Sequence, residues 1–168
     1  MHGTSQIYMK DFVDKYLSAY LEQPLNILDI GSKDEGGTYK ESFNRPNWVY
    51  KGLDIIPGGN VDIVVKEKYN WMEIEDGSYD VVISGQAFEH IEYIWDTMLE
   101  IARVLKKDGL VCVICPSKWE EHKFPVDCWR ILPDGMRALA KYASLEIIDV
   151  FMKEISTTQG DTVLICKK

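Results

Sequence analysis

The sequence is short of cysteine and lacks any long apolar run, and each shortage excludes a class of protein. Four cysteines in 168 residues are too few and too scattered for the disulfide framework of a small secreted domain. No run approaches the roughly 18 apolar residues of a membrane span, and residues 1–10 lack the apolar stretch of a secretory signal. We therefore expect a cytoplasmic protein with no membrane partner.

Basic charge is also scarce. The chain has 19 Lys and Arg against 27 Asp and Glu, which gives a formal net charge of −8. Its longest basic clusters are the pairs Lys106-Lys107 and Lys167-Lys168. Proteins that bind nucleic acid usually present a basic stripe, because counterion release from the phosphates drives their affinity. We therefore expect no nucleic-acid partner, and the same reasoning disfavours an anionic membrane surface.

Apolar residues are plentiful, and the length suits one folding unit. A chain of 168 residues corresponds to about one domain. Hydrophobic residues make up 46% of it, which is enough for one full core and excludes intrinsic disorder. We expect a single domain over residues 1–168, with its N-terminal helical segment in residues 1–23.

Helical and strand periodicities alternate along the chain and predict an α/β fold. Helices are expected at 5–21, at 94–105 and from about 133. Strands are expected at 25–30, 49–56, 61–65, 79–84, 110–115, 145–155 and 162–166. The alternation predicts a Rossmann-like, doubly wound, mostly parallel sheet with helices on both faces. Only residues 156–161 separate the last two strands, too few for a helical crossover, so they should form a hairpin that adds one antiparallel C-terminal strand.

Cys112 and Cys115 have the spacing of a CxxC motif. They lie, however, in the apolar run 110–115, which we expect to be a strand. Residues three apart in a strand point to opposite faces. We therefore interpret both as buried structural thiols rather than as metal ligands or a redox pair.

The loop after the first expected strand is the place to seek a ligand, because doubly wound sheets bind ligands at the carboxyl ends of their strands. The loop contains Gly31, Gly36 and Gly37. A P-loop would need lysine where Gly37 stands. A dinucleotide fingerprint would need glycine where Lys33 stands, and the acidic residues beside Lys33 would repel a diphosphate. S-adenosylmethionine (SAM) has no phosphate and is cationic, so it fits best.

Asp54 ends the second expected strand, next to that loop in a doubly wound sheet. A carboxylate there can accept hydrogen bonds from both ribose hydroxyls of a nucleoside. NAD sites and SAM sites share this feature, so Asp54 indicates an adenosine-containing ligand without choosing between them. The alternative is an aspartate in a solvated turn.

At this point the chain resembles the class I SAM-dependent methyltransferases, especially their small bacterial type. Five motifs carry the resemblance: LDIGS at Leu28–Ser32, GLDI at Gly52–Ile55, YDVVISGQAFEHI at Tyr79–Ile91, EIARVLKKDGL at Glu100–Leu110 and PVDCWRILPDGM at Pro125–Met136. It implies a seven-stranded sheet with an antiparallel last strand, and SAM as cofactor with S-adenosylhomocysteine (SAH) as its product.

The resemblance also implies cofactor contacts after three strands. Asp29, Gly31 and Ser32 would face the methionine part of SAM, Asp54 and Ile55 the ribose and adenine, and Gln86 and Ala87 the methyl group. The sequence departs from the family pattern at two loop glycines, which are Lys33 and Glu35 here. That departure puts the path of the loop in question.

Three residues are candidates for a catalytic base: His90, His122 and Asp127. His90 follows the fourth expected strand near the methyl position, and the other two lie in an aromatic loop. The resemblance places residues 116–132 on the substrate side, with Trp129 and Arg130 as candidate substrate-binding residues. The alternatives are a structural His90, a solvated His122 and an ion pair between Asp127 and Arg130.

The residues after the fourth strand also bear on the acceptor. Methyltransferases that act on exocyclic amines of nucleic-acid bases usually carry an Asn/Asp-Pro-Pro-aromatic turn there, whereas this chain has Gly85-Gln86-Ala87-Phe88. We expect methyl transfer to a small-molecule or carbohydrate-type acceptor, with no metal. A SAM-binding subunit without catalytic activity and an NAD-dependent oxidoreductase are the alternatives. Aromatic residues such as Trp95 or Trp119 could also form a homodimer surface.

Overall fold

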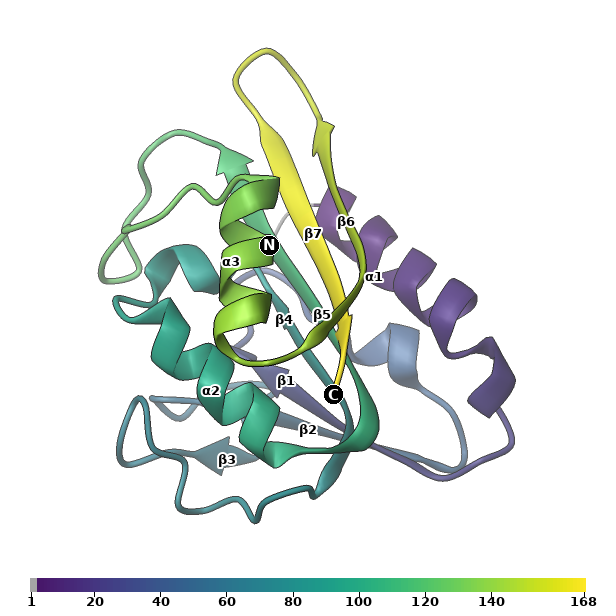
Figure 1. Ribbon diagram of the computed structural model, residues 1–168. Coiled ribbons are helices and arrows are strands. Elements are labelled where there is room, and N and C mark those ends of the chain that lie inside the picture. Colours follow the sequence, from purple (N-terminus) through teal and green to yellow (C-terminus); the bar gives the residue numbers. More distant parts are fainter. Residues whose placement is uncertain (1–2) are drawn as a thin grey trace.

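The computed structural model describes residues 3–168, which form a seven-stranded sheet in the order β3-β2-β1-β4-β5-β7-β6 (Figure 1). The strands are β1 (Leu25–Ile30), β2 (Trp48–Asp54), β3 (Ile63–Val64), β4 (Tyr79–Gly85), β5 (Leu105–Lys118), β6 (Glu146–Glu154) and β7 (Gly160–Lys167). Strands β1 to β5 pair in parallel, whereas β7 is antiparallel to both β5 and β6. The predicted mostly parallel sheet and C-terminal hairpin are therefore confirmed.

Helices cover both faces of the sheet, as predicted. Helix α1 (Gly3–Tyr16) packs on one face, and α2 (Ile94–Val104) and α3 (Pro133–Tyr142) pack on the other (Figure 1). The prediction that the first helix reaches Leu21 was wrong. Leu17 is buried, but the chain then turns through a short 3₁₀ helix and leaves Leu21 exposed, so no apolar contact extends the helix. Within residues 3–168 no helix is long and apolar enough to span a membrane.

The centre of the sheet is buried on both faces. Cys112 lies in the apolar cluster on the α1 side and Cys115 in the cluster on the α2 and α3 side, so the pair does point to opposite faces. Both thiols are fully buried, whereas Cys128 is exposed. Burial raises the pKa of Cys115 well above its ordinary value, which keeps this thiol protonated and unreactive.

The connection from β3 to β4 contains no α-helix. Two charged residues of α2 hold it instead. Glu100 accepts the backbone N–H of Trp71 at 2.7 Å, and Arg103 donates to the carbonyls of Trp71 and Ile74, both at 2.9 Å. Trp71 is thereby fixed in the core at 1% exposure. This anchoring replaces the crossover helix that would otherwise cover this part of the sheet.

We predict that Arg103→Met lowers the free energy of unfolding by about 1–3 kcal/mol, because two carbonyls and the Glu100 carboxylate lose their donor. Urea denaturation measures the effect. Arg137→Met is the matched control, since that guanidinium pairs only with the exposed Asp134 among its contacts in residues 3–168, and it should change stability by less than about 0.5 kcal/mol. Equal effects of the two changes would contradict this account of the connection.

Candidate functional site

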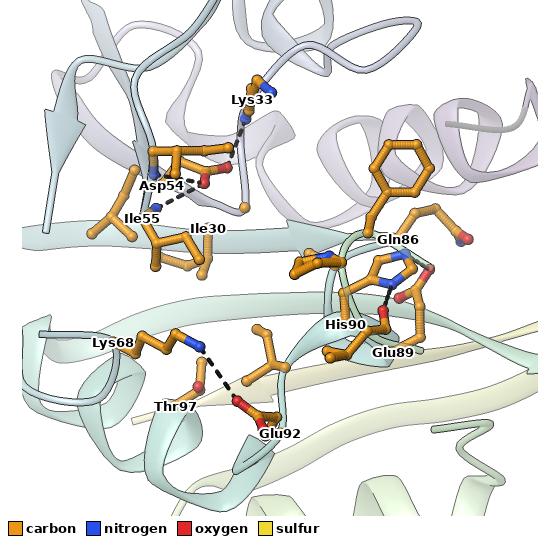
Figure 2. Close-up of a pocket in the computed structure, with 18 of the residues that line it drawn as sticks. Ile30, Lys33, Asp54, Ile55, Lys68, Gln86, Glu89, His90, Glu92 and Thr97 are labelled. Atoms are coloured by element: carbon orange, nitrogen blue, oxygen red, sulfur yellow. Dashed lines mark hydrogen bonds and ion pairs between the residues drawn. The ribbon is translucent and has the colours of Figure 1, made fainter. Parts of the chain in front are cut away.

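A cavity of about 670 Å³ opens at the carboxyl ends of β1, β2 and β4. Strand β1 lies between β2 and β4. The chain that leaves β1 continues to β2 and the chain that leaves β4 continues to β5, in opposite directions along the sheet. This is the point of a doubly wound sheet at which ligands bind. Figure 2 shows Lys33, Asp54 and Ile55 at one side of the cavity and Gln86, Glu89 and His90 at the other. We call these sides the β2 half and the β4 half.

The loop after β1 reaches the cavity through Gly31, which has a φ of +70°. A Cβ atom at this position would lie 2.5 Å from the Cβ of Ala87, so only glycine fits between the two loops. Further along, the Asp34 carboxylate accepts the backbone N–H groups of Gly36 and Gly37 at 3.1 and 2.7 Å. The loop therefore forms its turns without the two glycines that the resemblance would place at 33 and 35.

Lys33 and Glu35, the two departures from the family pattern, pair with each other. Their Nζ and Oε1 atoms are 2.6 Å apart, and the hydrogen bond to Glu35 raises the pKa of Lys33. Both side chains line the cavity. Because the pair is close to neutral, it adds little net charge to the β2 half.

Asp54 joins two loops through its carboxylate. Its Oδ1 atom accepts the backbone N–H groups of Ile55 at 2.7 Å and Ile56 at 3.3 Å, and its Oδ2 atom accepts that of Lys33 at 3.1 Å. A carboxylate offers roughly four lone-pair positions, so Oδ2 retains one acceptor position beside the cavity. Asp54 and Ile55 both line the β2 half, and their contacts with ribose and adenine, which the resemblance implies, stay a prediction.

Asp29 and Ser32 are buried and are not among the lining residues within 3–168. Asp29 is 2% exposed and accepts a hydrogen bond from the Tyr50 hydroxyl. Burial raises the pKa of Asp29 to about 7. The Ser32 hydroxyl donates to the Asn60 carbonyl at 3.0 Å, and the Asn60 amide donates back to the Ser32 carbonyl at 2.9 Å. Both residues position the loop, and their predicted contact with SAM stays a prediction.

The loop after β4 presents Gln86 and Ala87 to the cavity. Gln86 has a φ of +56°, and its backbone N–H donates to the Ile114 carbonyl at 2.9 Å. Its side-chain amide donates to Asp161 of β7 at 3.1 Å. The strained backbone is thus held from two sides. A 3₁₀ helix at Phe88–His90 follows and turns Glu89 and His90 into the cavity.

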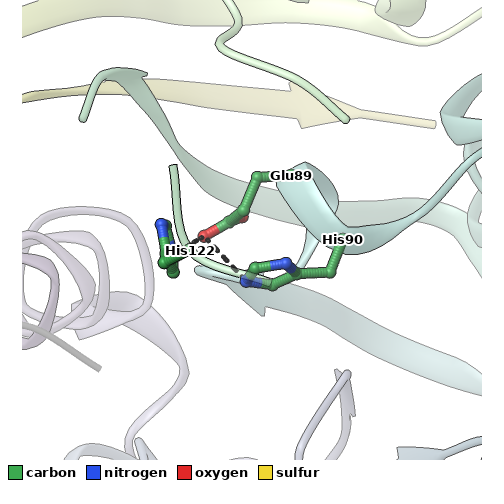
Figure 3. Close-up of side chains that lie close together, drawn as sticks. All are labelled: Glu89, His90 and His122. Atoms are coloured by element: carbon green, nitrogen blue, oxygen red, sulfur yellow. Dashed lines mark ion pairs between the residues drawn. The ribbon is translucent and has the colours of Figure 1, made fainter. Parts of the chain in front are cut away.

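Glu89, His90 and His122 come together in the β4 half and are called the Glu–His–His cluster below (Figure 3). The Oε1 atom of Glu89 lies 3.8 Å from Nε2 of His90 and 4.0 Å from Nε2 of His122. Glu89 is fully buried. Burial raises its pKa to about 8 and lowers the pKa of His90. Both predicted histidines therefore reach the cavity, together with a carboxylate that sequence reasoning did not place in the site.

Asp127, Trp129 and Arg130 support the cavity from outside its lining. The Arg130 guanidinium donates to both Asp127 oxygens, at 2.6 and 2.7 Å, and lowers the pKa of that carboxyl. The Trp129 indole donates to the Ile91 carbonyl at 2.8 Å. Trp129 and Arg130 line a separate depression beside α3. Their predicted roles in substrate binding, and that of Asp127 as a base, stay predictions.

The sheet order, the reversed β7 and the cavity at the switch point define the fold of the class I SAM-dependent methyltransferases. Residues 40–113 match the family model of the methyltransferase domain. Among curated proteins, the chain is 28% identical over 141 residues to the ubiquinone/menaquinone biosynthesis C-methyltransferase UbiE of Campylobacter jejuni, a match that covers 75% of this chain and 59% of that protein. The chain thus spans less than two thirds of the length of this relative.

Solved structures agree on the fold. The 1,6-didemethyltoxoflavin-N1-methyltransferase of Burkholderia thailandensis, which binds SAH, superposes with a TM-score of 0.70 at 12% identity, covering 98% of this chain and 78% of that one. The [4+2]-cyclase SpnF superposes with a TM-score of 0.74 at 13% identity, covering 97% and 80%. Residues 40–113 are thus similar in sequence to the methyltransferase domain family, and the chain shares the fold of these solved structures.

We predict that Asp29 destabilises the ligand-free protein as pH rises. Its folded pKa of about 7 exceeds the ordinary value of 3.8, so the folded state holds the proton more tightly, and the free energy of unfolding falls between about pH 4 and pH 7. Asp29→Asn should remove this fall and be more stable than wild type at pH 8, by up to about 4 kcal/mol. Urea denaturation from pH 5 to pH 8 measures the difference. Glu89, whose pKa is also raised, is present in both proteins, so the difference between their free energies of unfolding reports Asp29. A difference that stays constant from pH 5 to pH 8 would contradict the prediction.

Proposed function

We propose that the chain transfers a methyl group from SAM to a small-molecule or carbohydrate-type acceptor. The observation that carries the proposal is one cavity of about 670 Å³ that runs from Asp54 and Ile55 to the Glu–His–His cluster. A cavity of this size suits a small ligand and cofactor rather than a macromolecular surface. A donor in the β2 half and an acceptor in the β4 half would meet inside it, at Gly31 and Ala87.

The β2 half suits the cofactor. SAM supplies a methyl group on a positively charged sulfonium sulfur. Asp54 offers an acceptor position for a ribose hydroxyl, and Ile55 offers an apolar surface beside it for the adenine. Lys33 does not oppose the cationic ligand, because Glu35 neutralises it. The close approach of Gly31 to Ala87 brings the loops after β1 and β4 together where the two halves meet, so a cofactor there would contact both loops.

The β4 half suits the acceptor. Phe124 and Pro125 give it an apolar wall, and His90 and His122 line it. Transfer of a methyl group depends mostly on alignment and on exclusion of water, and a base is needed only where the acceptor atom carries a proton. The Nε2 atom of His90 or His122 can take that proton. We therefore keep both histidines as base candidates and place Asp127 behind them.

The relatives support an acceptor of modest size. The Burkholderia thailandensis enzyme is solved with 1,6-didemethyltoxoflavin bound, and UbiE is named for ubiquinone and menaquinone biosynthesis. The sequence after β4 lacks the turn of the nucleic-acid amine methyltransferases, and the net charge of −8 disfavours a polyanion. A small-molecule or carbohydrate-type acceptor satisfies all of these observations.

Binding of SAH tests the cofactor half directly. We expect calorimetry to detect SAH and SAM but neither NAD nor ATP. Asp54→Asn should weaken SAH binding at least 10-fold, because the ribose loses a charged acceptor. Glu92→Gln is the matched control, because Glu92 lines the cavity but pairs with Lys68, and it should change affinity by less than about threefold. Unchanged SAH affinity in Asp54→Asn, with a native circular dichroism spectrum, would remove that residue from the site.

Turnover tests the reaction itself. SAM is incubated with the protein and with pools of sugars, phenols, quinol-type rings and small acids, and release of SAH is followed by mass spectrometry. We expect SAH to form only when an acceptor is present, and His122→Ala to slow its formation at least 10-fold. Tight SAH binding without turnover on any pool would instead favour a SAM-binding subunit that regulates a partner.

A further inference from the structure

The Glu–His–His cluster turns three electron-pair acceptors toward one another, Oε1 of Glu89 and the Nε2 atoms of His90 and His122. The Oε1 atom of Glu89 lies 3.8 Å and 4.0 Å from the two histidine Nε2 atoms, distances too long for hydrogen bonds. Although Glu89 is fully buried, this oxygen has no hydrogen-bond partner among the described residues 3–168. A buried carboxylate oxygen in that position is costly unless something positively charged pairs with it.

The protonation of the two rings is set on their far sides. The Nδ1 atom of His90 lies 2.7 Å from the Val126 carbonyl, and that of His122 lies 3.0 Å from the Glu120 carbonyl. A carbonyl oxygen only accepts, so each Nδ1 carries the proton and each neutral ring directs the lone pair of Nε2 toward Glu89. Hydrogen bonds from Nδ1 to backbone carbonyls are the usual support of metal-binding histidines.

We propose that the Glu–His–His cluster binds one divalent transition-metal ion, of the zinc type, on the wall of the β4 half. Two histidines and one glutamate form a donor set of catalytic zinc sites, which keep a further position open. Around a tetrahedral zinc with bonds of about 2.0–2.2 Å, ligand atoms lie about 3.4 Å apart. The separations from Glu89 are 3.8 and 4.0 Å, and all three ligand atoms lie within 4.8 Å of one another, so side-chain rotations would bring them to this spacing.

The surroundings of the cluster suit a site that also binds the acceptor. All three ligand residues line the cavity, and the exposed fractions of the His90 and His122 side chains are 14% and 30%. The open position of the ion therefore faces the β4 half. Asp127 supports His122 from behind, since its Oδ2 atom accepts the backbone N–H of His122 at 2.7 Å. Nitrogen ligands select a transition metal over magnesium or calcium.

A bound metal ion would restrict the methyl acceptor to molecules that can coordinate it. This step rests on the proposed function. A hydroxyl, enol or phenol oxygen can occupy the open position. Coordination lowers the pKa of that hydroxyl. Its proton then passes to solvent water rather than to His90 or His122, whose Nε2 lone pairs would hold the ion. The oxygen keeps the electron pair that forms the bond to the methyl carbon, while the bond from that carbon to the sulfonium sulfur breaks and its electron pair leaves with SAH. The structure thus favours an oxygen acceptor, or a carbon acceptor activated through an adjacent enol oxygen.

Direct metal binding tests the proposal without SAM or acceptor. Cys128 is the exposed thiol of the chain, so all proteins carry Cys128→Ser and are first dialysed against a chelator. Titration with Zn²⁺ against a chromophoric chelator should give one site per chain. His122→Ala and Glu89→Gln should each weaken Zn²⁺ binding at least 100-fold. Co²⁺ should give a visible d–d absorption that His122→Ala removes.

Glu92→Gln is the matched control, because Glu92 lines the same cavity but pairs with Lys68, and it should leave Zn²⁺ affinity unchanged. His122→Ala lies in a loop, so it keeps the test valid if the buried Glu89→Gln fails to fold. Absence of Zn²⁺ binding, or equal affinity in wild type and His122→Ala, would overturn the metal site. SAH binding to the chelator-treated protein is measured alongside, so failure of the metal site is distinguishable from failure of the methyltransferase proposal.

Discussion

The parallel pairing of β1 with β2 on one side and β4 on the other is the constraint on which the site depends. Ile30 pairs with Leu53 on one side and with Ser84 on the other, so the three strands end at the same edge of the sheet. Gly31, Asp54 and Gln86 therefore line one cavity although more than fifty residues separate the first from the last. Burial of β1 and β4 on both faces makes this register rigid. The buried core thus fixes the edge of the sheet from which the loops with the site residues extend.

A second contact positions the other half of the cavity. The segment that carries His122 has no helix or strand in residues 119–132, so side chains must define its path. Arg130 does so by pairing with Asp127 and by donating to the carbonyls of Trp119 and Glu120. The ion pair between Arg130 and Asp127, given above as the alternative to a catalytic role, therefore positions His122 beside Glu89. The ion pair acts by holding the loop of residues 119–132 over the cavity.

The features that depend on local sequence patterns could be predicted from the sequence. Apolar runs and turn residues predicted the strands and the hairpin, and Asp54 was expected at the cavity because it ends β2. The approach of His122 to His90 depends on a loop path that no periodicity encodes. Glu89 was missed as a site residue because a carboxylate next to an apolar strand resembles a solvated turn. Its signal in the sequence was its place between Phe88 and His90, just after the fourth strand.

The central claim is that one cavity holds the methyl donor beside Asp54 and presents its methyl position to the Glu–His–His cluster. A crystal structure of the protein with SAH measures this most directly. The account predicts density for the adenosine beside Asp54 and Ile55, with the sulfur between Gly31 and Ala87 and facing His90 and His122. SAH bound elsewhere, or in this cavity with its sulfur directed away from the histidines, would contradict it.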